Sequence, residues 1–132
     1  MRIRNLLTRH LLPLDDLDAA VAQYQGMFGQ EARMRFDYPE MGLKLAQVGQ
    51  LLLIGGSDAA LAPFRATDMT FLVEGIADYA ATLPARGATI IDPVKRVPSG
   101  RNMLVRHADG ALVEYVEHDR PHPDDDVLSP AA

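Results

Sequence analysis

A chain of 132 residues suits a single domain, or two half-domains that share one core. Its formal net charge of −5 argues against nucleic acid as a partner, because phosphate binding needs a basic surface. The lack of cysteine excludes disulfides and thiolate metal sites. The sequence has neither a signal-peptide core nor the roughly 20 apolar residues of a membrane helix, so we expect a cytoplasmic location without membrane partners.

The first half of the chain predicts a strand, a helix and three further strands. Residues 3–14 alternate as a strand, and Asp15 and Asp16 then supply an N-cap and favourable negative charge at a helix start. Helical spacing of apolar residues continues to Gly29, which is placed to end the helix. Turn residues then separate three extended segments, predicted at 32–38, 43–48 and 51–54.

The second half repeats this order after a linker predicted at residues 57–66. A strand at 69–73 precedes a helix ending at Gly87, and Pro84 should kink or shorten its last turn because proline lacks a donor. The remaining segments are strands at 88–91, 102–107 and 111–117, a loop at 93–100 and an Asp-Gly hairpin turn. Residues 119–132 are acidic and proline-rich, and they predict a flexible tail.

A near-constant offset relates the two halves at a strand, a helix end and a hairpin turn. The offsets are 59, 58 and 61 residues for the pairs Arg9/Asp68, Gly29/Gly87 and Gly49/Gly110. This periodicity predicts an α+β fold of two tandem βαβββ modules, at about 3–56 and 67–118 of a single domain over 1–118. We expect a curved mixed sheet with the helices on its convex side.

Two motifs carry a family resemblance. The segment 14–24, followed by Met27, Phe28 and Gly29, combines an acidic cap with an aromatic pair near the end of the helix. The segment 100–115 ends in Arg-His-Ala-Asp-Gly, an apolar stretch and Glu. Both resemble the vicinal oxygen chelate superfamily, which contains glyoxalase I, extradiol dioxygenases, epimerases and bleomycin-resistance proteins. The resemblance implies the glyoxalase/bleomycin-resistance fold and a homodimer.

The resemblance also implies four equivalent positions, on the first and last strand of each module, from which metal-dependent members draw ligands. Counted along this chain, these positions are Arg9, Leu53, Asp68 and Glu114. A guanidinium repels a cation and a leucine has no ligating atom, so only two carboxylates remain and no metal cofactor is expected. His10 would join the set only after a one-residue register slip, which would turn the neighbouring leucines outward.

The charged residues of this set leave two interpretations open. Arg9 can bind a carboxylate or phosphate of a ligand while Asp68 and Glu114 hold an amine or hydroxyl. Alternatively, Arg9 forms an ion pair with Asp68 or Glu114, and no ligand is involved. Arg101 is either a residue at the pocket mouth or a solvated arginine. His107, before the hairpin turn, is interpreted as structural or exposed.

Two classes of function follow. The first is a binding protein that holds a small organic molecule in a concave pocket without metal, in the manner of bleomycin-resistance sequestration or sensing. The second is a lyase, isomerase or dioxygenase that is metal-dependent or uses Glu114 and Asp68 as acid and base. In that case Arg9 would stabilise an enolate-like intermediate. The sequence favours binding, although the family contains both classes.

Overall fold

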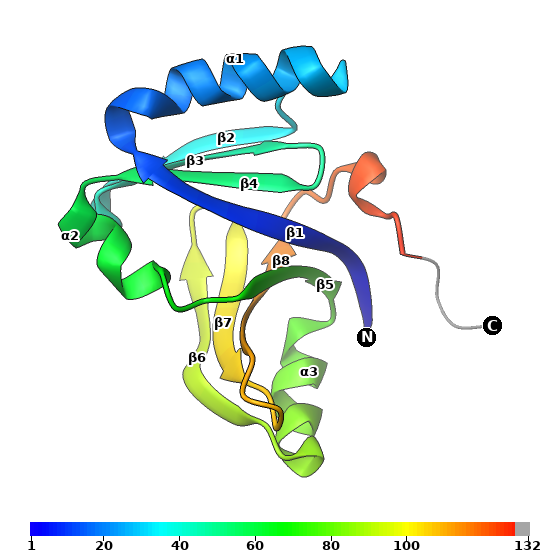
Figure 1. Cartoon of the computed structure of the whole chain (residues 1–132). Coiled ribbons are helices and arrows are strands. Elements are labelled where there is room, and N and C mark those ends of the chain that lie inside the picture. The colour runs from blue at the N-terminus through cyan, green and yellow to red at the C-terminus, as the bar shows by residue number, and fades with distance from the viewer. Residues whose placement is uncertain (129–132) are drawn as a thin grey trace. The chain divides into compact units, whose positions relative to one another are not determined.

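The computed structural model describes residues 1–128, which divide into two compact units (Figure 1). The first-half unit is Thr8–Ala66, and the second-half unit joins Met1–Leu7 to the chain from Thr67 onward. Strand β1 (Arg2–Pro13) contributes residues to both. Each unit contains a βαβββ module, which confirms the predicted α+β fold class. Among the described residues, no helix is long and apolar enough to cross a membrane.

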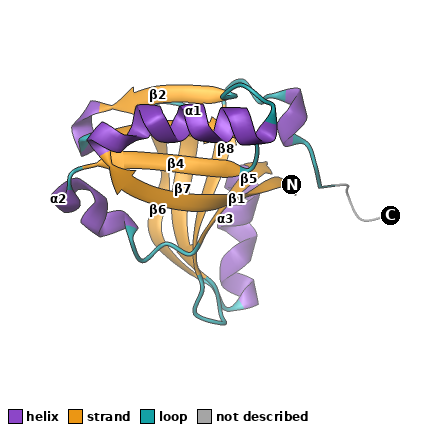
Figure 2. Cartoon of the chain, turned by 45° about the horizontal axis from the view of Figure 1, so that its top comes forward, coloured by secondary structure: helices purple, strands orange, loops and turns teal. Residues whose placement is uncertain are grey.

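In the first-half unit, helix α1 (Leu17–Phe28) lies across one face of a mixed sheet (Figure 2). In order across the sheet, the strands are β2 (Met34–Tyr38), β3 (Leu43–Val48), β4 (Leu51–Gly56) and residues 8–13 of β1. The β1 segment runs parallel to β4, and the other neighbours are antiparallel. The core between sheet and helix consists of Leu12, Leu17, Val21, Ala46, Val48 and Leu53.

The two ends of α1 differ in how the predicted capping residues act. Gly29 adopts φ 65°, the left-handed conformation in which glycine avoids a Cβ clash, and its N–H donates to the Gln25 carbonyl. At the start, Leu14–Asp16 forms a 3-10 turn that leads into the helix. The Asp16 side chain makes no capping hydrogen bond within the described chain. The acidic start therefore acts through its charge near the helix dipole.

The segment 57–66, predicted as a linker, contains short helical pieces. Helix α2 (Asp58–Leu61) continues into a 3-10 turn at Ala62–Phe64. Ser57 caps the helix, because its hydroxyl accepts a hydrogen bond from the Ala60 N–H at 3.1 Å. Burial of Leu61, 1% exposed, anchors this short helix.

In the second-half unit, helix α3 (Ile76–Thr82) packs on one face of a second mixed sheet. In order across it, the strands are residues 2–7 of β1, β5 (Met69–Glu74), β8 (Leu112–His118), β7 (Gly100–Arg106) and β6 (Thr89–Val97). Strands β5 and β8 are parallel. The core beneath α3 consists of Val73, Ile76, Leu83, Met103, Val105, Val113 and Tyr115.

The predictions made around two prolines of this unit differ in outcome. Pro84 shortens the helix as predicted, since α3 gives way to a 3-10 turn at Leu83–Arg86 that ends at Gly87. The predicted loop at 93–100 was wrong, because β6 runs through Pro93 to Val97. β6 is an edge strand with register shifts between Ile90 and Lys95, and a proline is tolerated where no partner needs its missing N–H.

The C-terminal segment, for which the sequence predicts a flexible tail, follows a defined path along β1 as far as residue 128. A 3-10 turn at Pro123–Asp125 places Asp125, 2% exposed, where its carboxylate accepts a hydrogen bond from Asn5 Nδ2 at 3.2 Å. The Val127 and Leu128 N–H groups both donate to the Arg4 carbonyl at 3.0 Å. Residues 129–132 of the expected tail lie outside the described residues.

Candidate functional site

A half-buried carboxylate in the second-half unit is fixed by two neutral donors. Glu114 Oε1 accepts a hydrogen bond from the Thr70 hydroxyl at 3.0 Å. Its other oxygen, Oε2, accepts from the Asn102 Nδ2–H at 3.0 Å. We call these three residues the Glu114 cluster. Charge-assisted bonds of this kind hold the carboxylate in one orientation.

Strand register explains why these residues meet. Val113 and Tyr115 belong to the core beneath α3, so the alternation of side chains along β8 turns Glu114 to the opposite face of the sheet. Thr70 lies directly opposite Glu114 on the neighbouring parallel strand. Asn102 reaches the carboxylate from the other neighbour, β7. The cluster thus brings together side chains that are up to 44 residues apart in sequence.

Asn102 also presents an acceptor. Its Oδ1 atom is buried and has no hydrogen-bond partner among residues 1–128. A buried acceptor without a partner costs about 1–3 kcal/mol, so a ligand N–H or O–H group at this atom would recover that energy. The cluster therefore combines carboxylate and amide acceptors.

The groups around Glu114 direct hydrogen-bond donors at its carboxylate. Thr70 and Asn102 direct an O–H and an N–H at the carboxylate, and these donors already complement its negative charge. Within the described part of the chain, no three His, Cys, Asp or Glu side chains are grouped to hold a metal ion. The donor set suits hydrogen bonding to an amine or hydroxyl of a ligand.

Two other predicted site residues of this unit make structural contacts. Asp68 Oδ2 accepts a hydrogen bond from the Leu112 N–H at 2.8 Å, and the Asp68 N–H donates to the Leu112 carbonyl at 2.8 Å. Arg101 forms an ion pair with Glu117, whose Oε2 also accepts from the Gly75 N–H at 2.7 Å. Burial tends to raise the pKa of Glu117, but the bonds from Gly75 and Arg101 hold it below its ordinary value.

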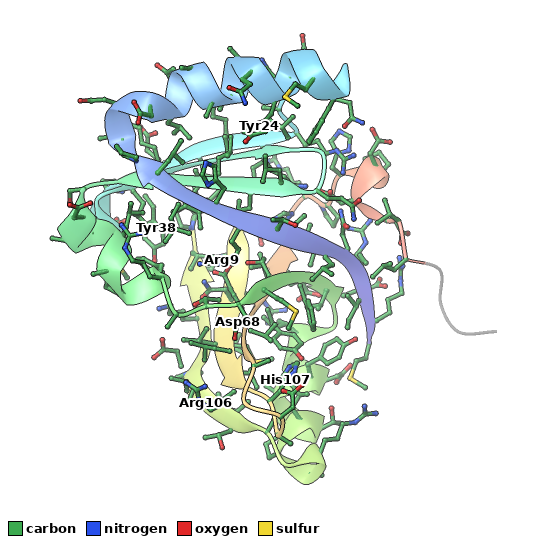
Figure 3. The ribbon with its side chains drawn as sticks, viewed as in Figure 1. Arg9, Tyr24, Tyr38, Asp68, Arg106 and His107 are labelled. Atoms are coloured by element: carbon green, nitrogen blue, oxygen red, sulfur yellow. The ribbon has the colours of Figure 1, made fainter. Side chains whose placement is uncertain are left out.

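The remaining predicted residues lie in the first-half unit. Arg9, labelled in Figure 3, is half-buried, lies opposite Leu52 and donates from Nη2 to the Phe64 carbonyl at 3.5 Å. Leu53 is 0% exposed and packs in the core beneath α1, so its assignment to the site was wrong. The cause is the alternation of side chains along a strand, because a one-residue error in the repeat offset moves a residue to the other face of the sheet. His10 lies opposite Leu53 and is exposed.

His118 lies further along β8, four residues from Glu114 and therefore on the same face. Burial lowers the pKa of its imidazole below the ordinary 6.5. Asp125 acts against this effect and Arg4 acts with it, because the carboxylate favours the charged ring and the guanidinium disfavours it. The neutral imidazole is thus favoured next to the buried C-terminal turn.

Sequence reasoning missed Thr70 and Asn102. Neither residue type is distinctive, and both contacts depend on which strands are neighbours and in which register. The signal that was available is the repeat itself, because it makes the first and last strands of each module equivalent pairs. The first-half pair, β1 and β4, and the second-half pair, β5 and β8, are both parallel neighbours.

The fold also occurs in an uncharacterized protein from Methanosarcina mazei, which has 43% sequence identity and a TM-score of 0.83. The match covers 92% of this chain and 98% of that chain. The chain belongs to the family of that protein. No family model and no curated protein matches its sequence.

More distant solved structures show the same fold. Methylmalonyl-CoA epimerase from Mycobacterium tuberculosis has 18% identity and a TM-score of 0.68, covering 89% of this chain and 90% of that chain. The Streptomyces coelicolor enzyme, in complex with 2-nitronate-propionyl-CoA, has 22% identity and a TM-score of 0.66, covering 90% and 95%. The epimerase belongs to the vicinal oxygen chelate superfamily, so the architecture is of the type that the resemblance implies.

Proposed function

We propose that the chain binds a small organic molecule at the Glu114 cluster without a resident metal ion. The observation that supports this proposal is the Glu114 carboxylate, half-buried and oriented by Thr70 and Asn102. Together with the buried Oδ1 of Asn102, it favours a ligand that donates hydrogen bonds through an amine or hydroxyl group.

The surroundings of the cluster favour a ligand with an apolar body. Leu112 and Val116 share the Glu114 face of β8 and are 7% and 8% exposed. Leu72 has the corresponding position on β5 and is 3% exposed. A few oriented polar groups within an aliphatic surface are typical of small-molecule sites, where apolar contact gives affinity and polar contact gives orientation. Arg9 stays a predicted binder of an anionic group.

The proposal is tested on the freshly purified full chain by native mass spectrometry and metal analysis. We expect a retained organic molecule that the Glu114→Gln variant loses, because the amide is uncharged and replaces one of the two acceptor oxygens with an NH2 donor. Glu40→Gln, at an exposed position in a 3-10 turn, is the matched control and should retain the molecule. Should nothing co-purify, the same variants are titrated with a set of small amines and alcohols by NMR.

Two results would contradict the proposal. One is a stoichiometric transition metal bound at submicromolar affinity. The other is equal retention or binding of the organic molecule by the Glu114→Gln variant and the unmodified chain.

A second candidate function is proton abstraction next to a thioester carbonyl. It is favoured by the shared fold with methylmalonyl-CoA epimerases and by the oriented carboxylate of Glu114, while Asp68 is engaged by the Leu112 backbone. Glu114 would remove the proton on C2 of methylmalonyl-CoA, and the resulting enolate would be reprotonated at the same carbon. Incubation in D2O should then place deuterium at C2, as seen by NMR, and Glu114→Gln should prevent it. No incorporation by the unmodified chain would contradict this function.

We also propose a homodimer, on the basis of the family resemblance. Large apolar side chains remain exposed in each unit, including Met27 at 68% and Ile91 at 45%. Light scattering at micromolar concentration tests the proposal, and a monomer would contradict it.

A further inference from the structure

A cavity of the second-half unit lies on the α3 side of its sheet, the face opposite the Glu114 cluster. Its volume is about 400 Å³. It is bordered by the end of α3, the turn at Gly87 and the hairpin turn that follows His107, which Figure 3 labels. Tyr115 lines it, and Tyr115 follows Glu114 directly on β8, so the two sites use opposite faces of one strand.

Aromatic rings form the wall of this cavity. The Tyr115 ring meets Phe71 edge-on, with centroids 5.4 Å apart, and lies 5.4 Å from Tyr79. The His107 ring is 6.0 Å from Phe71 and 5.9 Å from Tyr115. Rings held by each other in these geometries are preorganised to receive a further planar ring.

A hydrogen bond fixes the polar part of the wall. His107 Nε2 and the Tyr115 hydroxyl lie 2.7 Å apart. Burial raises the pKa of Tyr115 to about 12, so its phenol stays neutral at physiological pH. The aromatic part of the wall is therefore uncharged.

Arg86 supplies a cation at the rim. Its side chain is exposed and makes no hydrogen bond or ion pair within residues 1–128. Arg86 lines the cavity together with Tyr79 and Tyr115, and its charge opposes the effect of burial, which raises the pKa of both phenols. Asp109 borders the same rim, and its Oδ1 accepts a hydrogen bond from the Ala111 N–H at 3.0 Å.

We propose that this cavity binds a small aromatic carboxylate. The ring stacks against the aromatic wall, and the carboxylate pairs with Arg86, whose planar guanidinium matches it. The volume falls at the lower end of the range for ligand pockets, which favours a ligand of one or two fused rings. The negative charge of Asp109 disfavours a second anionic group, so monoanions are preferred over dianions. This site goes beyond the proposed function, because it shares no residue with the Glu114 cluster.

The probe for the test is 2-naphthoate, with neutral 2-naphthamide as its matched comparison, titrated into the ¹⁵N-labelled full chain. We expect 2-naphthoate to shift the amide signals of Ala88, Ala108 and Asp109, and to bind more tightly than the amide. Arg86→Gln should weaken 2-naphthoate by about tenfold, the loss of one charge-assisted contact, and leave 2-naphthamide unchanged. Arg120→Gln, at an exposed arginine outside the cavity, should change neither.

Two further variants separate this site from others. Ala108→Leu adds bulk at an exposed position of the rim and should weaken both probes. Glu114→Gln should leave both unchanged, so a failure of the proposed function does not affect this test. The proposal is overturned if 2-naphthoate does not bind, if its shifts map to the Glu114 face, or if Arg86→Gln binds it as the unmodified chain does.

Discussion

The two units repeat one backbone order, but their last strands differ in chemistry. In β4 of the first-half unit, Leu52, Leu53 and Ile54 follow one another and are 5%, 0% and 3% exposed, so both faces of the strand are aliphatic and buried. In β8 of the second-half unit, Tyr115 faces α3 and Glu114 faces away from it. The repeat thus preserves strand pairing and helix packing, while a carboxylate is present on the last strand of only the second-half unit.

The largest expected effect on the free energy of unfolding comes from β4, the aliphatic strand. Leu53→Ala should lower the free energy of unfolding by about 2–5 kcal/mol, because it removes a fully buried side chain and leaves a cavity beneath α1. Leu14→Ala, at a side chain 39% exposed, should cost less than about 1 kcal/mol. Urea denaturation of both variants measures the difference. A small loss for Leu53→Ala would mean that this leucine faces a ligand site, as the repeat alone predicted.

A smaller effect is expected when β8 is made to resemble β4. Glu114→Leu should cost about 1–3 kcal/mol, because it leaves the Thr70 hydroxyl and the Asn102 amide without their acceptor. The triple variant Thr70→Val, Asn102→Leu, Glu114→Leu removes donors and acceptor together and should recover most of that loss. If the loss in free energy of unfolding of the triple variant equals the sum of the losses of the three single variants, the three residues do not act as a unit.

Local chemistry allowed most elements to be predicted from the sequence. Gly29 and Gly87 mark helix ends because the left-handed conformation there needs glycine, at φ 65° and φ 84°. Strand β3 has the predicted bounds because turn residues flank it on both sides. Ser57 was available as a cap for α2, but small residues and Pro63 were interpreted as a linker.

Contacts that depend on register could not be predicted with the same success. The repeat offset varies between 58 and 61 residues, and on a strand with a period of two such a drift decides which face a residue occupies. It placed Leu53 on the wrong face. It could not show that Asn102 reaches Glu114, or that His107 and Tyr115, eight residues apart around a hairpin, share a hydrogen bond.

The smallest expected effect is on the pH dependence of stability, and it distinguishes two strand histidines, one in each unit. His118 is partly buried on β8, and burial holds its pKa below 6.5, whereas His10 on β1 is exposed. Because the unfolded chain binds a proton to His118 more readily than the folded chain does, the stabilising contribution of the neutral ring is present above pH 6.5. It is lost as the pH falls from 6.5 toward the lower pKa of the folded state.

We therefore expect the free energy of unfolding to decrease between pH 7 and pH 5, and this slope to be shallower in His118→Gln than in the unmodified chain. His10→Gln is the matched control and should retain the full slope. Urea denaturation at intervals across this range measures it. A slope that His118→Gln leaves unchanged, or that His10→Gln removes, would mean that the buried C-terminal turn does not desolvate His118. In that case, the second-half unit would not differ from the first in how it holds its histidine.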